Sequence, residues 1–353
     1  MFKPIRRLIS AVVLVVLTCL LVLAARLFPA FFFSFYPKVS RTIISYLSSV
    51  TGVLPFALWE IAAGILLLSF LISFIVYLCK GRFLRWATGW LVFLCAGIFF
   101  FVGAWGLNYF APPMEERLGF QVEEYTPQEL REATEYYLAK ANAAAPLVAR
   151  DENGVVVAKD LSDLSQAALE SYESLKVECL ETSSAPVKPL LTSPLFGATG
   201  TTGFFLAFTG ESCVSSTTFS GSMPYTVCHE IAHRMAFARE NEANFAAFLA
   251  CSASQRADLQ YSGYYAAFVY CYNALYRADP EAGAQVWAKT CQEIRTDAAA
   301  SRAHYDRVEN KKAVAVTGKV YDTYLKTFAV ESGKQSYGEV VDLLAAWYFE
   351  EIK

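Results

Sequence analysis

The chain has 353 residues, of which 55% are apolar and 18% are charged, and its formal net charge at pH 7 is −3. Soluble domains carry about 25% charged residues, so this composition excludes a disordered chain and an ordinary soluble protein. It favours a membrane protein with a globular part attached. Nucleic-acid binding is not expected, because it would require at least a basic surface.

Three long apolar segments near the start of the chain predict transmembrane helices. They cover residues 8–25, 54–79 and 86–108, and Glu60 is the one charged residue inside them. Each segment is long enough to cross about 30 Å of hydrocarbon as an α-helix. Residues 1–109 are therefore expected to form a three-helix transmembrane region in a lipid bilayer. Glu60 lies near the start of its segment, which favours a position at the membrane interface over an intramembrane site.

The basic residues around these segments predict their orientation. Six of them lie before the first segment or between the second and the third: Lys3, Arg6, Arg7, Lys80, Arg82 and Arg85. The loop between the first and second segments holds two, Lys38 and Arg41. Because basic loops stay in the cytoplasm, the N-terminus is expected there, and three crossings place the chain after about residue 110 outside the cytoplasm. A cleaved signal peptide is the alternative for the first segment, but further spans follow it and no clear cleavage site does.

Residues 110–353 are expected to form an extracytoplasmic domain that is mainly helical. The sequence Thr-Pro-Gln-Glu at residues 126–129 combines a capping box with a proline in the first turn, which predicts a helix start. A second helix is expected over residues 161–180, with Ser162 as a possible cap. The chain after Tyr225 has a mostly helical pattern to its end.

Other segments predict the non-helical parts and one surface helix. Residues 185–203 are rich in Pro, Gly, Ser and Thr, which predicts a long loop. Residues 203–209 suit a short strand, either in the core or pairing with an extended peptide backbone. Residues 31–49 mix aromatic, basic and serine residues, which is typical of a helix at the membrane surface.

The pattern His-Glu-x-x-His at residues 229–233 carries the chemistry of this chain. On a helix, His229 and His233 share one face, and two neutral imidazoles suit a zinc ion. Glu230 is offset by about 100° around the helix axis. It can therefore flank the metal and act as general base and then general acid on zinc-activated water. Two core histidines beside a surface acid are the alternative interpretation.

Zinc in a catalytic site needs a third protein ligand, and Glu240 is the preferred candidate. It lies seven residues after His233, a helical distance of about 10 Å, so the chain must bend around residues 236–238, where no glycine is present. Glu242 is the rival ligand. Asn244 shares a helix face with Glu240 and can accept a hydrogen bond from a ligand histidine.

These residues resemble the gluzincin metallopeptidases, in which a glutamate ligand lies four residues before an Asp or Asn. Several motifs also occur in the order of a bacterial membrane family catalogued as domain of unknown function 3810: Phe208-Thr209-Gly210-Glu211, Pro224-Tyr225, the His229–His233 box, Glu240–Phe245, Tyr261-Ser262-Gly263 and Ser336-Tyr337-Gly338. The resemblance spans most of the chain, including the membrane spans. This chain departs from its relatives at Ala236, where many have glycine, and at Asn244, where many gluzincins have Asp.

The resemblance implies a multi-pass protein of the bacterial cell membrane with an α-rich, zincin-like domain that contains a small β element. It implies zinc bound by His229, His233 and Glu240, with Glu230 as the catalytic residue.

A developing oxyanion needs a hydrogen-bond donor besides zinc, and the sequence leaves this donor open. The candidates are His304, Tyr261, Tyr264, Tyr305 and Tyr337. Glu211 could approach the site or be a turn residue, and its interpretation as a turn residue is favoured. No nucleotide site is expected, because the glycines at 197, 200 and 203 lack the Gly-Lys-Ser/Thr ending of a phosphate loop.

Six of the nine cysteines fall after residue 110: Cys179, Cys213, Cys228, Cys251, Cys271 and Cys291. They could form disulfides, or they could be ordinary core residues, as the apolar surroundings of Cys228, Cys251 and Cys271 suggest.

The leading hypothesis is a membrane-anchored zinc metallopeptidase that acts on a peptide or protein substrate. The alternative is a catalytically silent zinc-binding protein that serves as an envelope sensor or scaffold, which the intact Glu230 disfavours. An intramembrane protease is a third possibility. It is disfavoured because the His-Glu-x-x-His box begins about 120 residues after the last span.

Overall fold

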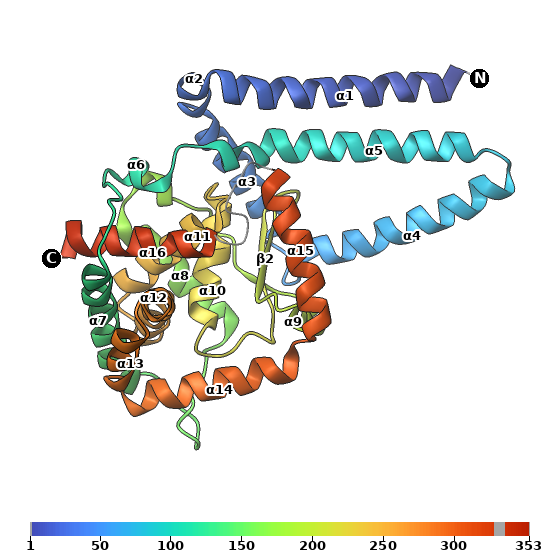
Figure 1. Cartoon of the computed structure of the whole chain (residues 1–353). Helices are drawn as coiled ribbons and strands as arrows, with labels where there is room; N and C mark the ends of the chain where they lie inside the picture. Colours follow the sequence, from blue (N-terminus) through green and yellow to red (C-terminus); the bar gives the residue numbers. More distant parts are fainter. Residues whose placement is uncertain (1, 328–335, 353) are drawn as a thin grey trace.

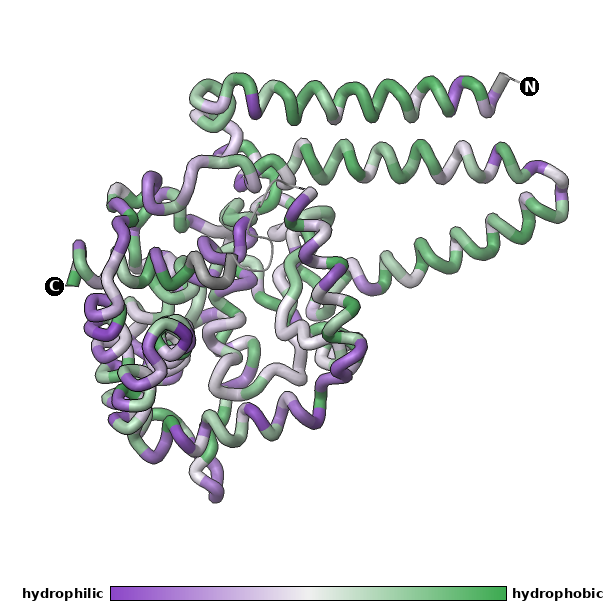
Figure 2. The backbone as a smooth tube through the Cα atoms, in the orientation of Figure 1, coloured by the Kyte–Doolittle hydropathy of each residue, from purple (hydrophilic) through white to green (hydrophobic). Residues whose placement is uncertain are grey.

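Three long apolar helices project from one side of a helical domain (Figure 1). The computed structural model describes residues 2–327 and 336–352. The projecting helices are α1 (Phe2–Leu27), α4 (Leu58–Cys79) and α5 (Phe83–Ala104), and each is long and apolar enough to cross a membrane. Figure 2 shows their continuous hydrophobic colouring against the mixed surface of the domain. The predicted mainly α fold with an N-terminal membrane region is thus confirmed.

The bounds of all three helices differ from the predicted segments, and α1 extends beyond the first segment at both ends. Helix α4 begins at Leu58, because Pro55 and the turn that follows Thr51 occupy the start of the apolar segment. Helix α5 ends at Ala104, where the chain tightens into the 3-10 helix η1 (Gly106–Phe110).

Helix α1 packs along α5, whereas α4 meets α5 only near the turn that joins them. Leu21 lies against Gly103 of α5. In contrast, the Ser73 hydroxyl of α4 accepts hydrogen bonds from Trp86 at 3.0 Å and Trp90 at 3.2 Å, early in α5. From there the two helices diverge toward the domain (Figure 1).

The segment expected as a helix at the membrane surface forms two helices, α2 (Pro29–Phe33) and α3 (Tyr36–Thr51). Helix α3 joins the end of α5 to the domain. Ser40 donates to the Ala104 carbonyl at 2.7 Å, and Ser48 accepts a hydrogen bond from Arg234 of the domain at 3.2 Å.

The domain core lies among helices that are distant in the sequence. After α6 (Met114–Leu118), these are α7 (Pro127–Ala144), α8 (Leu161–Leu175), α10 (Met223–Arg234), α11 (Glu240–Ala253), α12 (Ala257–Ala278), α13 (Pro280–Ala288) and α16 (Ser336–Trp347). Short 3-10 turns, η2 (Ala145–Leu147) and η3 (Glu178–Leu180), follow α7 and α8, and a π-helical turn, η5 (Tyr348–Ile352), follows α16. Tyr137, Phe248 and Phe268 are among the largest fully buried side chains.

The helix starts show which capping predictions held. At α7 the capping box is present: the Thr126 hydroxyl accepts from the Glu129 N–H, and the Glu129 carboxylate accepts from the Thr126 N–H. At α8 the cap is Asp160 and not Ser162, because the Asp160 carboxylate accepts from the Ser162 N–H. This helix ends at Leu175, five residues earlier than predicted, because Lys176 adopts a left-handed conformation with φ 53°.

A three-stranded sheet lies beside α10. Its order is β1 (Lys188–Pro189), β3 (Glu211–Val214) and β2 (Gly203–Leu206), with β1 parallel and β2 antiparallel to β3. The predicted strand ends at Leu206 because its carbonyl accepts from Gly210, whose φ of 66° closes a turn. The predicted loop over residues 185–203 contains β1 and a short helix, α9 (Ser193–Ala198).

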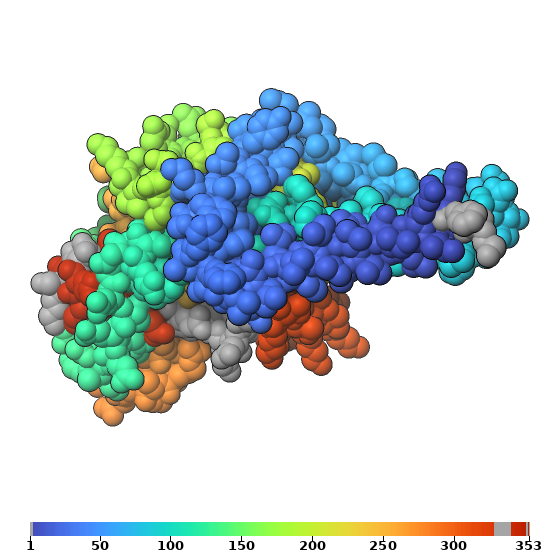
Figure 3. Space-filling view, turned by 90° about the horizontal axis from the view of Figure 1, so that it is seen from above, coloured from blue at the N-terminus to red at the C-terminus, as the bar shows by residue number. Residues whose placement is uncertain are grey.

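Two further helices complete the domain, and the second of them lies beside the spans. Helix α14 (Gln292–Val308) leads to α15 (Lys311–Thr327), which runs across the side of the domain that the spans leave, next to β2 (Figure 1). Seen from above, the spans leave the domain together, and α15 is exposed beside their bases (Figure 3).

All nine cysteines lie in the described part of the chain, and all are free thiols. The disulfides that the sequence left open are therefore not formed. Cys228 and Cys251 are buried with their sulfur atoms 3.5 Å apart, as core residues of α10 and α11.

Candidate metal centre

Helix α10 presents two histidines to one point. Val227 and Ile231 on its opposite side are fully buried, so the helix is fixed by the hydrophobic core. The i,i+4 spacing of His229 and His233 brings their Nε2 atoms to 3.2 Å from each other. Both rings therefore direct a nitrogen lone pair or proton at the same small space.

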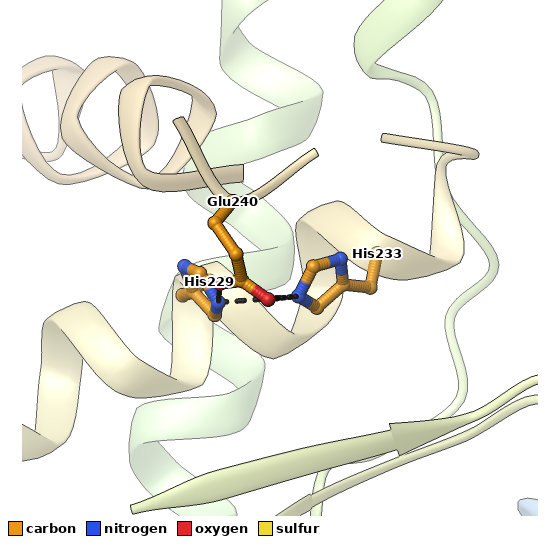
Figure 4. Close-up of side chains that lie close together, drawn as sticks. All are labelled: His229, His233 and Glu240. Atoms are coloured by element: carbon orange, nitrogen blue, oxygen red, sulfur yellow. Dashed lines mark hydrogen bonds and ion pairs between the residues drawn. The ribbon is translucent and has the colours of Figure 1, made fainter. Parts of the chain in front are cut away.

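Helix α11 adds a carboxylate to this pair. The Glu240 Oε2 lies 3.2 Å from Nε2 of His229, and Oε1 lies 3.8 Å from Nε2 of His233. Figure 4 shows Glu240 reaching from the start of α11 toward both imidazoles. One candidate ligand atom from each of the three residues falls within 4.8 Å of the others, a group that could hold a metal ion.

The bend that brings Glu240 back occurs at Ala236. This residue has a φ of 71°, in the left-handed region that glycine adopts more easily. After the bend, the Phe237 carbonyl accepts a hydrogen bond from Nδ1 of His233 at 2.7 Å. That bond fixes the ring orientation and leaves Nε2 for a metal. The expected bend is thus made without a glycine.

The rival Glu242 lies elsewhere. Its carboxylate pairs with Arg239 at 2.9 Å and accepts from the Met114 N–H at 3.0 Å. The structure therefore brings Glu240, and not Glu242, to the histidines.

Burial and charge shift the pKa values in this cluster in different directions. Burial would raise the pKa of Glu240, but the hydrogen bond from His229 and the nearby imidazoles outweigh it and lower that pKa to about 2. Burial lowers the pKa of His233 to about 4. Burial would also lower the pKa of His229, yet Glu240 raises it above its ordinary value. An ionised Glu240 beside a neutral His233 is the ligand state that a divalent cation requires.

Glu230 is the buried acid next to this cluster. Its side chain is 4% exposed, and Oε2 has no hydrogen-bond partner among the described residues. Burial raises the pKa of this carboxyl to about 8. Its neighbour on the sheet is Gly203: a Cβ atom there would come within 2.2 Å of Glu230 Oε1. The Glu230 carboxylate therefore occupies the space that a side chain at residue 203 would fill.

Three residues around the cluster were not found from the sequence. Trp105, the residue after α5, donates its indole N–H to the His233 carbonyl at 3.1 Å. Tyr321 of α15 donates its hydroxyl to Glu240. Gly203 makes room for Glu230. All three residues are distant in the sequence from residues 229–240. No local sequence pattern links them to the cluster, so only the fold reveals them.

Asn244 lies close enough to His229 to contribute, after burial and the two carboxylates Glu240 and Glu230, to the shift in the pKa of this ring. As oriented, the Asn244 Nδ2 and the His229 Nδ1 are both buried without a partner of normal geometry. Exchange of the amide oxygen and nitrogen would offer this ring an acceptor. Asn244 is thus in the place predicted for a residue that orients a ligand histidine.

The other candidates are engaged elsewhere. His304 bonds with the Thr217 carbonyl at 2.7 Å, and the Tyr305 hydroxyl accepts a hydrogen bond from the Phe219 N–H at 3.3 Å. Tyr261 donates to Asp297, and Tyr264 packs on the Phe248 ring. The side chain of Tyr337 lies outside the described residues.

The interpretation of Glu211 as a turn residue is wrong. Glu211 begins β3, is buried, and pairs with Lys188 at 2.6 Å. Its two oxygens accept from the N–H groups of Leu58 and Trp59, at the first turn of α4. The acid therefore joins the sheet to a membrane span.

The donor set fits a zinc ion. Two imidazole nitrogens and one carboxylate, all from rigid helix positions, are the ligands that catalytic zinc sites use.

A family model matches most of this chain. The model of a family described as protein of unknown function (DUF3810) matches residues 34–345. Neither a search of curated proteins nor a search of solved structures finds a match.

Proposed function

The chain belongs to the DUF3810 family, whose description states no activity, and we propose from the geometry of its own site that it is a membrane-anchored zinc metallopeptidase. The observation that carries this proposal is the convergence of His229, His233 and Glu240 beside the buried, unpartnered carboxyl of Glu230. His229, His233 and Glu240 would hold the ion. When bound, zinc would supply Lewis acidity and lower the pKa of a water molecule.

Glu230 supplies the proton transfers. Its Oε2 takes a proton from the attacking water as the water oxygen adds to the peptide carbonyl carbon. The same carboxyl then gives this proton to the departing amine nitrogen, so the proton count balances over the cycle. Because Glu230 is buried and its Oε2 has no hydrogen-bond partner among the described residues, this carboxylate is available to carry the proton between the two steps.

A peptide is the proposed substrate because, among the described residues, no strand pairs with the outer edge of β2, whose Gly203 lies against Glu230. Extended peptides bind such edges through backbone hydrogen bonds. An orientation with the domain outside the cytoplasm is proposed from the basic residues Lys3, Arg7, Lys80, Arg82 and Arg85, which line one small cavity.

Metal analysis tests the ligands. Purified full-length protein, never exposed to chelator, is expected to hold about one zinc per chain, as a three-ligand catalytic site does. Replacing a ligand with alanine, as in His229→Ala, His233→Ala or Glu240→Ala, is expected to remove the ion, whereas Glu242→Gln should retain it. Equal zinc content in the Glu240→Ala and Glu242→Gln proteins would contradict the ligand set.

Activity tests the catalytic residue. The zinc-loaded protein is expected to cleave members of a peptide library, and Glu230→Gln is expected to lower the rate by about 10²-fold or more while zinc stays bound. If the wild-type protein cleaves nothing beyond what Glu230→Gln cleaves, the site binds metal without peptidase activity.

A further inference from the structure

The metal-ligating cluster lies directly at the end of a membrane span. Helix α5 ends at Ala104, and the next residue, Trp105, donates a hydrogen bond to the backbone of His233. Phe205 of β2 stacks on the His233 ring with centroids 6.2 Å apart. The side chain of Trp105 therefore connects the cluster directly to the end of α5, where we expect the chain to leave the hydrocarbon. In the sequence, residues 229–233 are far from α5.

The domain face beside the spans carries exposed apolar side chains. Four large hydrophobic side chains are exposed there: Leu191, Phe208, Val316 and Val320. Three observations place them near the bases of the spans. The Leu191 N–H donates to Glu60 of α4 at 2.6 Å, and the Phe208 ring stacks on Phe100 of α5 with centroids 5.6 Å apart. Helix α15, which carries the two valines, is exposed beside the same bases (Figure 3). An apolar face continuous with membrane helices is suited to contact lipid.

Strand β2 runs from this apolar face to Glu230. Its tip is the turn that contains Phe208, and its first residue, Gly203, lies against the Glu230 carboxyl. The Ser215 N–H donates to the Thr202 carbonyl at 2.8 Å. Because hydrogen-bonded pairs alternate in an antiparallel ladder, the backbone groups of Gly203 and Phe205 point away from β3. Among the described residues these groups have no backbone partner.

The free edge of β2 therefore links the membrane surface to the catalytic acid. A peptide paired with this edge would be extended, with one end at the level of Phe208 and its backbone passing Glu230. Helices α4 and α5 diverge on the same side of the domain as β2 (Figure 1).

We propose, resting on the metallopeptidase function proposed above, that the substrate is the extended segment of a membrane-anchored polypeptide immediately outside its own membrane span. This segment pairs with the outward backbone groups of Gly203 and Phe205. Its anchor stays in the bilayer beside α4 and α5, and the bond that is cleaved lies within a few residues of the anchor. An extended chain advances about 3.3 Å per residue, so few residues separate the hydrocarbon edge from a cluster at the end of α5.

The experiment uses the full-length protein, loaded with zinc and reconstituted in lipid vesicles, with three forms of one randomised peptide library. One form is soluble. The other two carry a hydrophobic membrane-spanning helix, joined to the random segment by a flexible spacer of about 4 or about 40 residues. Mass spectrometry records the rates and the cleaved positions, and the Glu230→Gln protein is the control in every arm.

Cleavage of the short-spacer library is expected to be at least about tenfold faster than cleavage of both other forms, with cuts near the anchor. The long-spacer library has nearly the same local concentration, because tethering by a flexible linker still confines it to the vesicle surface. If the two anchored libraries are cleaved at equal rates, or if the soluble library is cleaved as fast as the short-spacer library, the proposed substrate class is wrong. The proposed peptidase activity would still stand. No cleavage beyond the Glu230→Gln control in any arm would overturn the peptidase and this assignment with it.

Discussion

Ala236 shows how one strained residue serves the metal cluster. A left-handed backbone costs an L-residue about 1–2 kcal/mol, and here it turns the chain so that Phe237 bonds with His233 and Glu240 returns to the histidines. We expect Ala236→Gly to relieve this strain. Glycine gains conformational freedom in the unfolded chain, so the net increase in stability should be about 0.5–1 kcal/mol.

The measurement is the unfolding midpoint of the detergent-solubilised protein, with zinc removed so that metal binding does not contribute. Ala238→Gly is the matched control, because Ala238 is equally buried in the same segment without a positive φ. That variant should be less stable than the wild type. A similar decrease for both variants would show that the conformation of Ala236 costs nothing.

Gly203 limits where Glu230 can lie. A Cβ atom at residue 203 would come within 2.2 Å of the Glu230 carboxyl, so Gly203→Ala must displace the acid or the strand. We expect peptidase activity to fall by about 10²-fold, the usual contribution of a general base, while the zinc content stays unchanged. Gly97→Ala is the control, because its Cβ would meet Phe208 only at 4.0 Å. Full activity of Gly203→Ala would mean that Glu230 works from another position.

The attachment of β3 to the start of α4 depends on a buried ion pair. Glu211 is held by Lys188 and by the N–H groups of Leu58 and Trp59, and both charged side chains are almost fully buried. Removing one member of such a pair leaves a charge without a partner, which costs about 3–5 kcal/mol. Glu211→Ala should therefore lower the thermal midpoint strongly and speed limited proteolysis near residues 52–58.

The surface pair between Lys38 and Glu178 provides the comparison. Its side chains are 75% and 72% exposed, so Glu178→Ala should change stability by less than about 1 kcal/mol. Replacing both buried residues, Lys188→Met with Glu211→Leu, should recover part of the stability that Glu211→Ala loses. If Glu211→Ala and Glu178→Ala behave alike, the sheet does not hold α4 in place.

Local patterns explain what the sequence predicted of these elements. The three apolar segments, the capping box at Thr126 and the shared face of His229 and His233 all follow from spacing within one helix. The preference for Glu240 over Glu242 was supported by the helix face that Glu240 shares with Asn244 and by the resemblance to gluzincins. The role of Glu211 was misjudged because its partner Lys188 is distant in the sequence, and the adjacent Gly210 gives a turn signal that hides a buried strand residue.

The junction of the spans with the domain could not be read from the sequence. Trp105 reaches the His233 backbone, Ser48 of α3 accepts from the buried Arg234, and Glu60 binds the N–H groups of Leu191 and Thr192. Each contact joins segments more than 100 residues apart. None of these residues belongs to a local sequence pattern that would indicate its partner. The interval of about 120 residues between α5 and the His-Glu-x-x-His box suggested separation, whereas the fold makes them neighbours.

This junction predicts how the complete protein sits in a membrane. Helix α15 carries Lys311, Lys312, Lys319 and Lys326 together with the exposed Val316 and Val320, which is typical of a helix that lies in the membrane interface. Because α15 is exposed beside the bases of the spans, its valines should enter the headgroup region by about 5–10 Å (Figure 3). A nitroxide label on Val316→Cys should then be more accessible to oxygen than to a water-soluble nickel complex.

The measurement uses vesicle-reconstituted protein in which the exposed Cys19 and Cys79 are replaced by serine. Leu147→Cys is the matched control: Leu147 is 69% exposed, like Val316 at 62%, but it follows α7 on the side of the domain away from the spans (Figure 1). Its label should favour the nickel complex. Equal accessibilities at the two positions would mean that the domain stands clear of the lipid, and the apolar face would then need another partner.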